Sequence, residues 1–156
     1  MNRNYNALIL KSVKITAGAI LAILFASFLN LKYSATAGII TILSIQNTKK
    51  ETIQTALARG EAFCCALLVS FLCYNFFGYT TAAFGIYLLI FTTLCLAMKW
   101  SSAIAMDSVL ITHFLAEKTM NIPMIANEIS LFLIGAGIGV ILNLSLRPKE
   151  NAWKDK

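Results

Sequence analysis

Long apolar runs separated by short polar connections dominate this sequence, and their lengths predict the elements. Six runs are expected to form membrane-spanning helices: 12–30, 34–46, 56–77, 81–98, 102–117 and 124–146. The first, third, fourth and sixth hold or approach the ~20 apolar residues that a helix needs to cross a hydrocarbon core ~30 Å thick. The second and fifth are short, and the second could instead be re-entrant, which would leave five spans. The pattern predicts an all-α membrane protein with a six-transmembrane-helix bundle.

Composition agrees with lipid as the surrounding solvent. Of the 156 residues, 58% are hydrophobic and only 13% are charged, whereas a soluble domain carries about 25% charged residues. The charged residues gather in the connections and at the ends of the apolar runs. The net charge of +6 is therefore expected to orient the chain in a membrane, and no nucleic-acid partner is expected.

The distribution of lysine and arginine supports six crossings. With a cytoplasmic N-terminus and six alternating spans, the outer connections hold only Lys32 and Lys118. The inner regions hold the other basic residues: Arg3, Lys11, Lys14, Lys49, Lys50, Arg59, Lys99, Arg147, Lys149, Lys154 and Lys156. Positive charge collects on the cytoplasmic side of membrane proteins. If the second run did not cross, this bias would collapse, so six crossings are expected. With six crossings, the same bias places both termini in the cytoplasm.

The domain organisation follows from the same runs. Residues 1–148 are expected to form a single six-helix transmembrane domain, and residues 149–156 a cytoplasmic tail. The basic start and the small-residue triplet 35–37 resemble a signal-peptide cleavage site. Because that triplet lies within another apolar run and the preceding apolar stretch is long, we expect an uncleaved first span.

Two ionisable residues within the fifth run are candidates for proton or substrate coupling. Asp107 would lie about 9 Å from the start of its helix, where a charged carboxylate costs up to ~3 kcal/mol. It could couple transport, or it could cap a neighbouring helix or bond to hydroxyl groups. His113 lies about 120° around the helix from Asp107; it could relay protons, pair with Glu117 or be satisfied by a carbonyl.

Other polar and small residues have structural interpretations. Arg59 is expected to anchor the inner end of its helix, and Glu61 and Glu128 to lie at membrane interfaces. Gly135 and Gly139 form a G-x-x-x-G pair that lets two helices approach closely, either within the chain or between two copies.

The sequence offers no chemistry typical of an enzyme. It lacks a P-loop, an H-E-x-x-H pair and a G-x-S-x-G turn. All four cysteines lie in apolar runs without zinc-ligand spacing, and we expect them to pack between helices: Cys64, Cys65, Cys73 and Cys95. No metal site, cofactor or catalytic residue is expected.

Several stretches together resemble the small bacterial branch of the aromatic acid exporter family, part of the wider fusaric-acid-resistance group. They are the YSATAG segment with its polar, basic continuation to Lys50, the start of the third run at 56–59, the THFL segment at 112–115, and the glycine-bearing last run that ends in Arg147–Pro148. The resemblance covers nearly the whole chain. It implies six helices and efflux of small aromatic or organic acids across the bacterial inner membrane.

For such an anionic substrate, Arg59, Lys49 and Lys50 would attract the carboxylate at the cytoplasmic mouth, while Asp107 and His113 would couple protons. The expected partners are the lipid bilayer, a small anionic organic substrate and further copies of the chain, because six short helices barely enclose a path. Two alternatives remain open. One is a substrate-binding membrane subunit of a larger importer, and the other is a scaffold that transports nothing.

Overall fold

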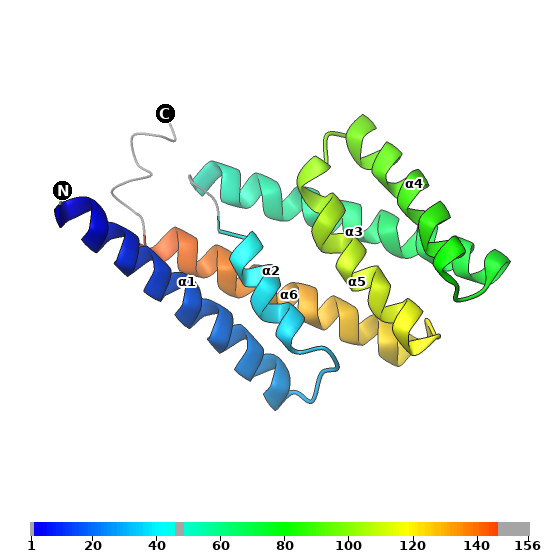
Figure 1. Ribbon diagram of the computed structural model, residues 1–156, viewed down its shortest axis with the longest axis horizontal. Helices are drawn as coiled ribbons and strands as arrows, with labels where there is room; N and C mark the ends of the chain where they lie inside the picture. The colour runs from blue at the N-terminus through cyan, green and yellow to red at the C-terminus, as the bar shows by residue number, and fades with distance from the viewer. Residues whose placement is uncertain (1, 46–48, 147–156) are drawn as a thin grey trace. The chain divides into compact units, whose positions relative to one another are not determined.

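The fold is helical throughout the part of the chain that the computed structural model describes, residues 2–45 and 49–146 (Figure 1). This confirms the expected all-α class. The elements are α1 (Asn2–Phe28), α2 (Ala35–Leu43), α3 (Lys49–Phe77), α4 (Thr81–Ala97), the 3₁₀ helix η1 (Ser101–Ala103), α5 (Ile104–Glu117) and α6 (Ile122–Leu146). The expected tail at 149–156 lies outside the described residues.

Within the described residues, three helices are long and apolar enough to cross a membrane. They are the apolar parts of α1, α3 and α6: Tyr5–Phe28, Lys50–Phe77 and Ile122–Leu144. The helices α1 and α3 begin well before the apolar runs expected at 12 and 56. The polar first turns of both helices therefore extend beyond the apolar stretches, where water or lipid headgroups can solvate them.

The two short runs give short helices. With 9 residues, α2 is ~14 Å long, and α5, with 14 residues, is ~21 Å long. Both are shorter than a ~30 Å hydrocarbon core, and α2 covers only part of the expected span 34–46. The number of membrane crossings therefore stays a prediction.

The described chain falls into two compact units. The first unit comprises residues 2–45, 49–53 and 129–146, and the second comprises residues 54–128. In the first unit, α2 returns alongside α1 after a short connection (Figure 1). Close packing against α2 depends on glycine: an added Cβ at Gly38 of α2 would lie 2.7 Å from Ile23 of α1.

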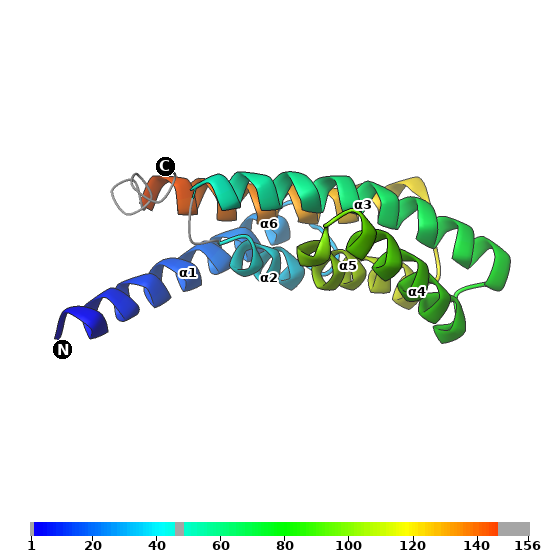
Figure 2. The ribbon, with the colours of Figure 1, turned by 90° about the horizontal axis from the view of Figure 1, so that it is seen from above.

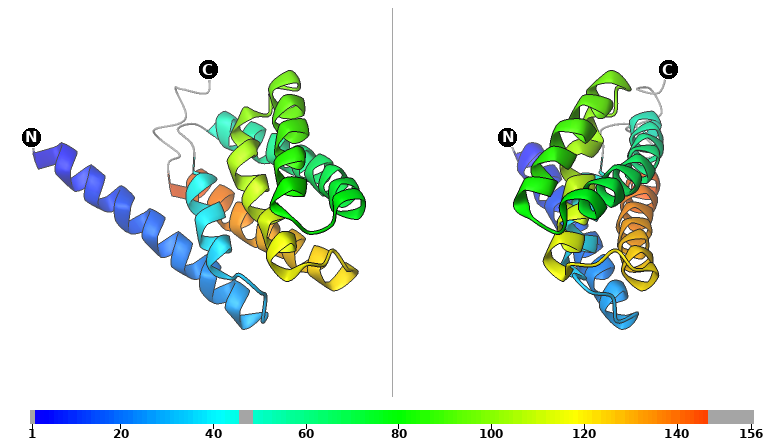
Figure 3. Two further views of the ribbon diagram at one scale, coloured as in Figure 1. Left: turned by 45° about the vertical axis from the view of Figure 1, so that its right-hand side comes forward. Right: turned by 90° about the vertical axis from the view of Figure 1, so that its right-hand side faces the viewer.

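The second unit is built around buried aromatic side chains. Tyr87 and Phe91 of α4 stack with ring centroids 5.3 Å apart, and Phe114 of α5 is buried in the same core. In this unit α4 and α5 lie side by side (Figure 2 and Figure 3). Cys73 and Cys95 are buried there as free thiols.

Many large apolar side chains face outward, which suits a lipid environment. On α1 alone, Leu8, Ile9, Leu24 and Phe28 are each at least 60% exposed. Soluble monomers seldom expose contiguous apolar surfaces of this kind. The outward surface of this helix therefore agrees with the apolar length of its span.

Candidate functional site

Arg59 is buried within the second unit. On α3, the small residues Ala62 and Ala66 follow at helical spacing and are fully buried, so another element can approach this face closely. The side chain of Arg59 donates through Nε to the carbonyl oxygen of Ser102 at 3.2 Å, and a terminal nitrogen lies 3.8 Å from Sδ of Met106. Only 6% of the residue is exposed. The guanidinium is therefore held against η1 and the start of α5.

Asp107 is the acidic residue that interacts electrostatically with Arg59. It lies in the first turn of α5 on the same face as Leu110, Ile111 and Phe114, all of them fully buried. Asp107 is itself 0% exposed and interacts electrostatically with Arg59. Yet neither carboxyl oxygen has a hydrogen-bond partner among the described residues. Burying a carboxyl group without a hydrogen-bond partner costs free energy, unless another group binds there and supplies that partner.

Two hydroxyl groups share this buried environment. Tyr87 of α4 is fully buried, interacts electrostatically with Asp107 and lies beside Ser108. Neither the Tyr87 hydroxyl nor the Ser108 hydroxyl meets a hydrogen-bond partner within the described part of the chain. Arg59, Tyr87, Asp107 and Ser108 thus form a polar cluster in an apolar core, which we call the Arg59–Asp107 cluster. It contains one cation, one acid and two hydroxyl groups.

His113 belongs to a second buried contact. Its Nδ1 lies 2.6 Å from Oε2 of Glu128, and both side chains are almost fully buried. The amide of Asn127 donates to the other carboxylate oxygen, Oε1, at 3.2 Å. Both oxygens of Glu128 therefore have partners. The pair joins α5 to the first two turns of α6, and the expected interface position of Glu128 stays a prediction.

A family comparison assigns the chain. The model of the aromatic acid exporter family, described as aromatic acid exporter family member 1, matches residues 7–146. The chain belongs to the aromatic acid exporter family. The resemblance noted in the sequence is thereby confirmed, and the match includes every helix that contributes to the Arg59–Asp107 cluster. It is a family of membrane transporters, which agrees with the apolar helices of this chain.

The chain is also similar in sequence to a protein of a named bacterium. The chain is 36% identical over 149 residues to a protein of Bacillus subtilis (strain 168) described as "Uncharacterized protein YqjA". The alignment covers 94% of this chain and 46% of that relative, so the chain spans about half the relative's length. No solved structure matches the chain.

The other residues expected to attract an exported acid belong to the first unit. Lys50 is exposed in the first turn of α3, and the side chain of Lys49 lies outside the described residues. Arg59 is buried in its own unit. A shared cytoplasmic mouth of these three residues stays a prediction. Among the described residues, no group of three or more His, Cys, Asp or Glu side chains could hold a metal ion.

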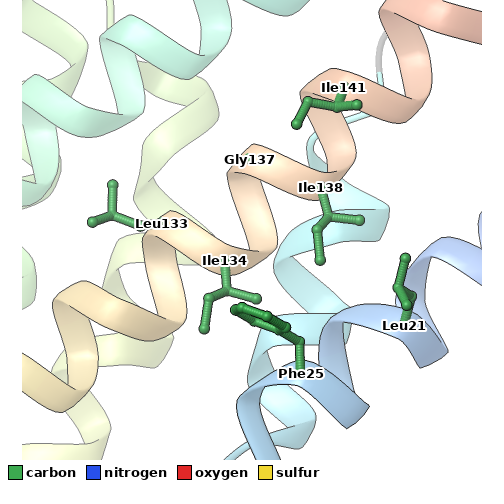
Figure 4. Close-up of a pocket in the computed structure, with 7 residues that line it drawn as sticks. All are labelled: Leu21, Phe25, Leu133, Ile134, Gly137, Ile138 and Ile141. Carbon is green, nitrogen blue, oxygen red and sulfur yellow. The ribbon is translucent and has the colours of Figure 1, made fainter. Parts of the chain in front are cut away.

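The first unit carries an open apolar groove. It lies between α1 and α6, has a volume of about 450 Å³ and is lined by Leu21, Phe25, Leu133, Ile134, Gly137, Ile138 and Ile141 (Figure 4). These residues offer no charged or hydroxyl group that would orient a carboxylate. We therefore place the candidate acid site at the Arg59–Asp107 cluster.

Proposed function

We propose that this chain is a subunit of an exporter for small aromatic or organic acids in the bacterial inner membrane. Membership of a transporter family supports the transport role. The choice of substrate rests on one observation. The guanidinium of Arg59 is buried in an apolar helical unit beside Asp107, whose carboxyl group has no hydrogen-bond partner among the described residues. Arginine recognises carboxylates by charge and by the geometry of its N–H groups. Asp107 and His113 are the proposed coupling residues.

We further propose six crossings with both termini in the cytoplasm, and assembly as a homo-oligomer. The strong inside bias of lysine and arginine supports the six crossings. Because α2 is short, its crossing would depend on contacts with α1 and α6 inside the first unit and on local thinning of the bilayer. Several copies would supply the enclosed path that six short helices barely provide.

The topology can be tested by labelling single cysteines. In a variant that lacks the four native cysteines, an impermeant maleimide added to intact cells should label Lys32→Cys and Asn121→Cys, which lie in the proposed outer connections. Glu51→Cys and Ser101→Cys should react only after the membrane is permeabilised. All four positions are exposed. Labelling of Glu51→Cys in intact cells would contradict the crossing by α2.

Export itself can be tested by acid accumulation. A strain that lacks the gene should accumulate more radiolabelled benzoate, or be inhibited by lower concentrations of aromatic acids, than the complemented strain. Aliphatic weak acids of similar hydrophobicity serve as the comparison series. Equal accumulation in both strains would contradict export, and lower accumulation in the deletion strain would instead favour the importer alternative.

A further inference from the structure

We propose that Arg59 binds the carboxylate of the exported acid and that Asp107 is an internal competitor for the same guanidinium. This rests on the proposed export function and adds to it the binding residue and the form in which the acid binds. In this view the acid binds together with one proton, which Asp107 takes up. The substrate carboxylate then replaces the ionised Asp107 as the negative partner of Arg59.

The geometry supports an exchange between two carboxylates. Asp107 is close enough to Arg59 for an electrostatic interaction, yet no hydrogen bond joins them and both Asp107 oxygens lack a partner among the described residues. A pair with only a structural role would be expected to close into direct, bidentate hydrogen bonds. The guanidinium instead bonds to the backbone at Ser102, so Asp107 balances its charge without occupying its donors.

Charge balance then decides which groups can be bound together. With Asp107 ionised and no substrate, Arg59 and Asp107 sum to zero. An anionic substrate added to that state would leave one uncompensated negative charge in an apolar core, which is strongly unfavourable. If Asp107 takes up a proton, Arg59 and the substrate carboxylate again sum to zero. Anion and proton therefore bind together, and their joint passage moves no net charge.

The neighbouring groups favour this exchange over capture of a metal cation. The charged or titratable groups that act on Asp107 are Arg59 from α3 and Tyr87 and Cys95 from α4. Tyr87 and Cys95 carry no charge in their protonated forms, so Arg59 is the charged group that acts on Asp107. A sodium ion beside Asp107 would be repelled by the guanidinium, whereas a proton forms a neutral acid. The hydroxyl groups of Tyr87 and Ser108 can accept from or donate to that acid.

The decisive experiment measures benzoate binding to the purified full chain over a pH series in which benzoate stays ionised. Wild-type affinity should fall about tenfold per pH unit once Asp107 loses its proton, as linkage to one proton requires. Asp107→Asn cannot ionise, so its affinity should stay at the low-pH value throughout the series. Arg59→Gln should lose roughly tenfold to hundredfold in affinity at every pH, and Arg59→Lys should retain part of it.

Matched controls separate this linkage from general effects of charge. Glu61→Gln removes an exposed acid from α3, and Lys99→Gln removes an exposed cation; both should keep the wild-type affinity and slope. Elution as a single species of wild-type size establishes that each variant is folded. An unchanged pH slope in Asp107→Asn, unchanged affinity in Arg59→Gln or the absence of benzoate binding by the wild type would each overturn the proposal. The accumulation assay decides the export function independently.

Discussion

Glu128→Ala should lower the free energy of unfolding by about 3–5 kcal/mol, the usual cost of removing one partner of a buried ion pair. Glu128 is 0% exposed; one carboxyl oxygen lies 2.6 Å from Nδ1 of His113, and the other accepts from the amide of Asn127. Its removal leaves the His113 ring nitrogen and the Asn127 amide without their present acceptor in a buried place. The loss can be measured on the full chain by equilibrium unfolding in mixed detergent micelles.

Two further variants show whether the charge or the hydrogen bonds carry this stability. Glu128→Gln keeps an acceptor without the charge, so it should lose less than Glu128→Ala. Glu61→Ala removes an exposed carboxylate from α3 and should change the stability by less than about 0.5 kcal/mol. If Glu128→Ala were as stable as Glu61→Ala, the contact between α5 and α6 would not be a stabilising pair.

Most of the helical framework could be predicted from the sequence, because apolar run length alone determines where a helix can cross lipid. The apolar parts of α1, α3 and α6 follow directly from their runs. The polar extensions of α1 and α3 could not be found in this way, since a helix can continue beyond the apolar stretch into water. The expected second run also included Ser44 and Ile45, which follow the end of α2 without extending the helix.

The candidate site was only partly predictable. Asp107 and His113 were identifiable as ionisable residues in an apolar run, but their partners lie on other helices. The short connection at 118–121 was a signal for the pairing of Glu128 with His113, because antiparallel helices bring together residues at similar distances from a short turn. Nothing in the sequence indicated that Arg59 is buried beside Asp107, or that Tyr87 and Ser108 complete the cluster.

Gly135→Ala and Gly139→Ala should each destabilise the first unit by about 1–3 kcal/mol, the usual cost of overpacking a close contact. An added Cβ at Gly135 would lie 2.6 Å from Cβ of Ile40 and 2.7 Å from the carbonyl oxygen of Ala37. At Gly139 it would lie 2.6 Å from Cβ of Ser44 and 2.9 Å from the carbonyl oxygen of Thr41. Because backbone atoms of α2 cannot rotate away, α2 and α6 would have to separate.

The intervening glycine provides a matched control on the same helix. An added Cβ at Gly137 would meet no atom within 4 Å, and alanine is favoured over glycine inside a helix by about 1 kcal/mol. Gly137→Ala should therefore be neutral or stabilising in detergent thermal-unfolding measurements, while the other two variants unfold at lower temperature. Separation of α2 from α6 would also weaken the hydrogen bond from Thr41 Oγ1 to the Gly135 carbonyl, now 2.9 Å long. Equal stability of all three alanine variants would contradict close α2–α6 packing as the role of Gly135 and Gly139.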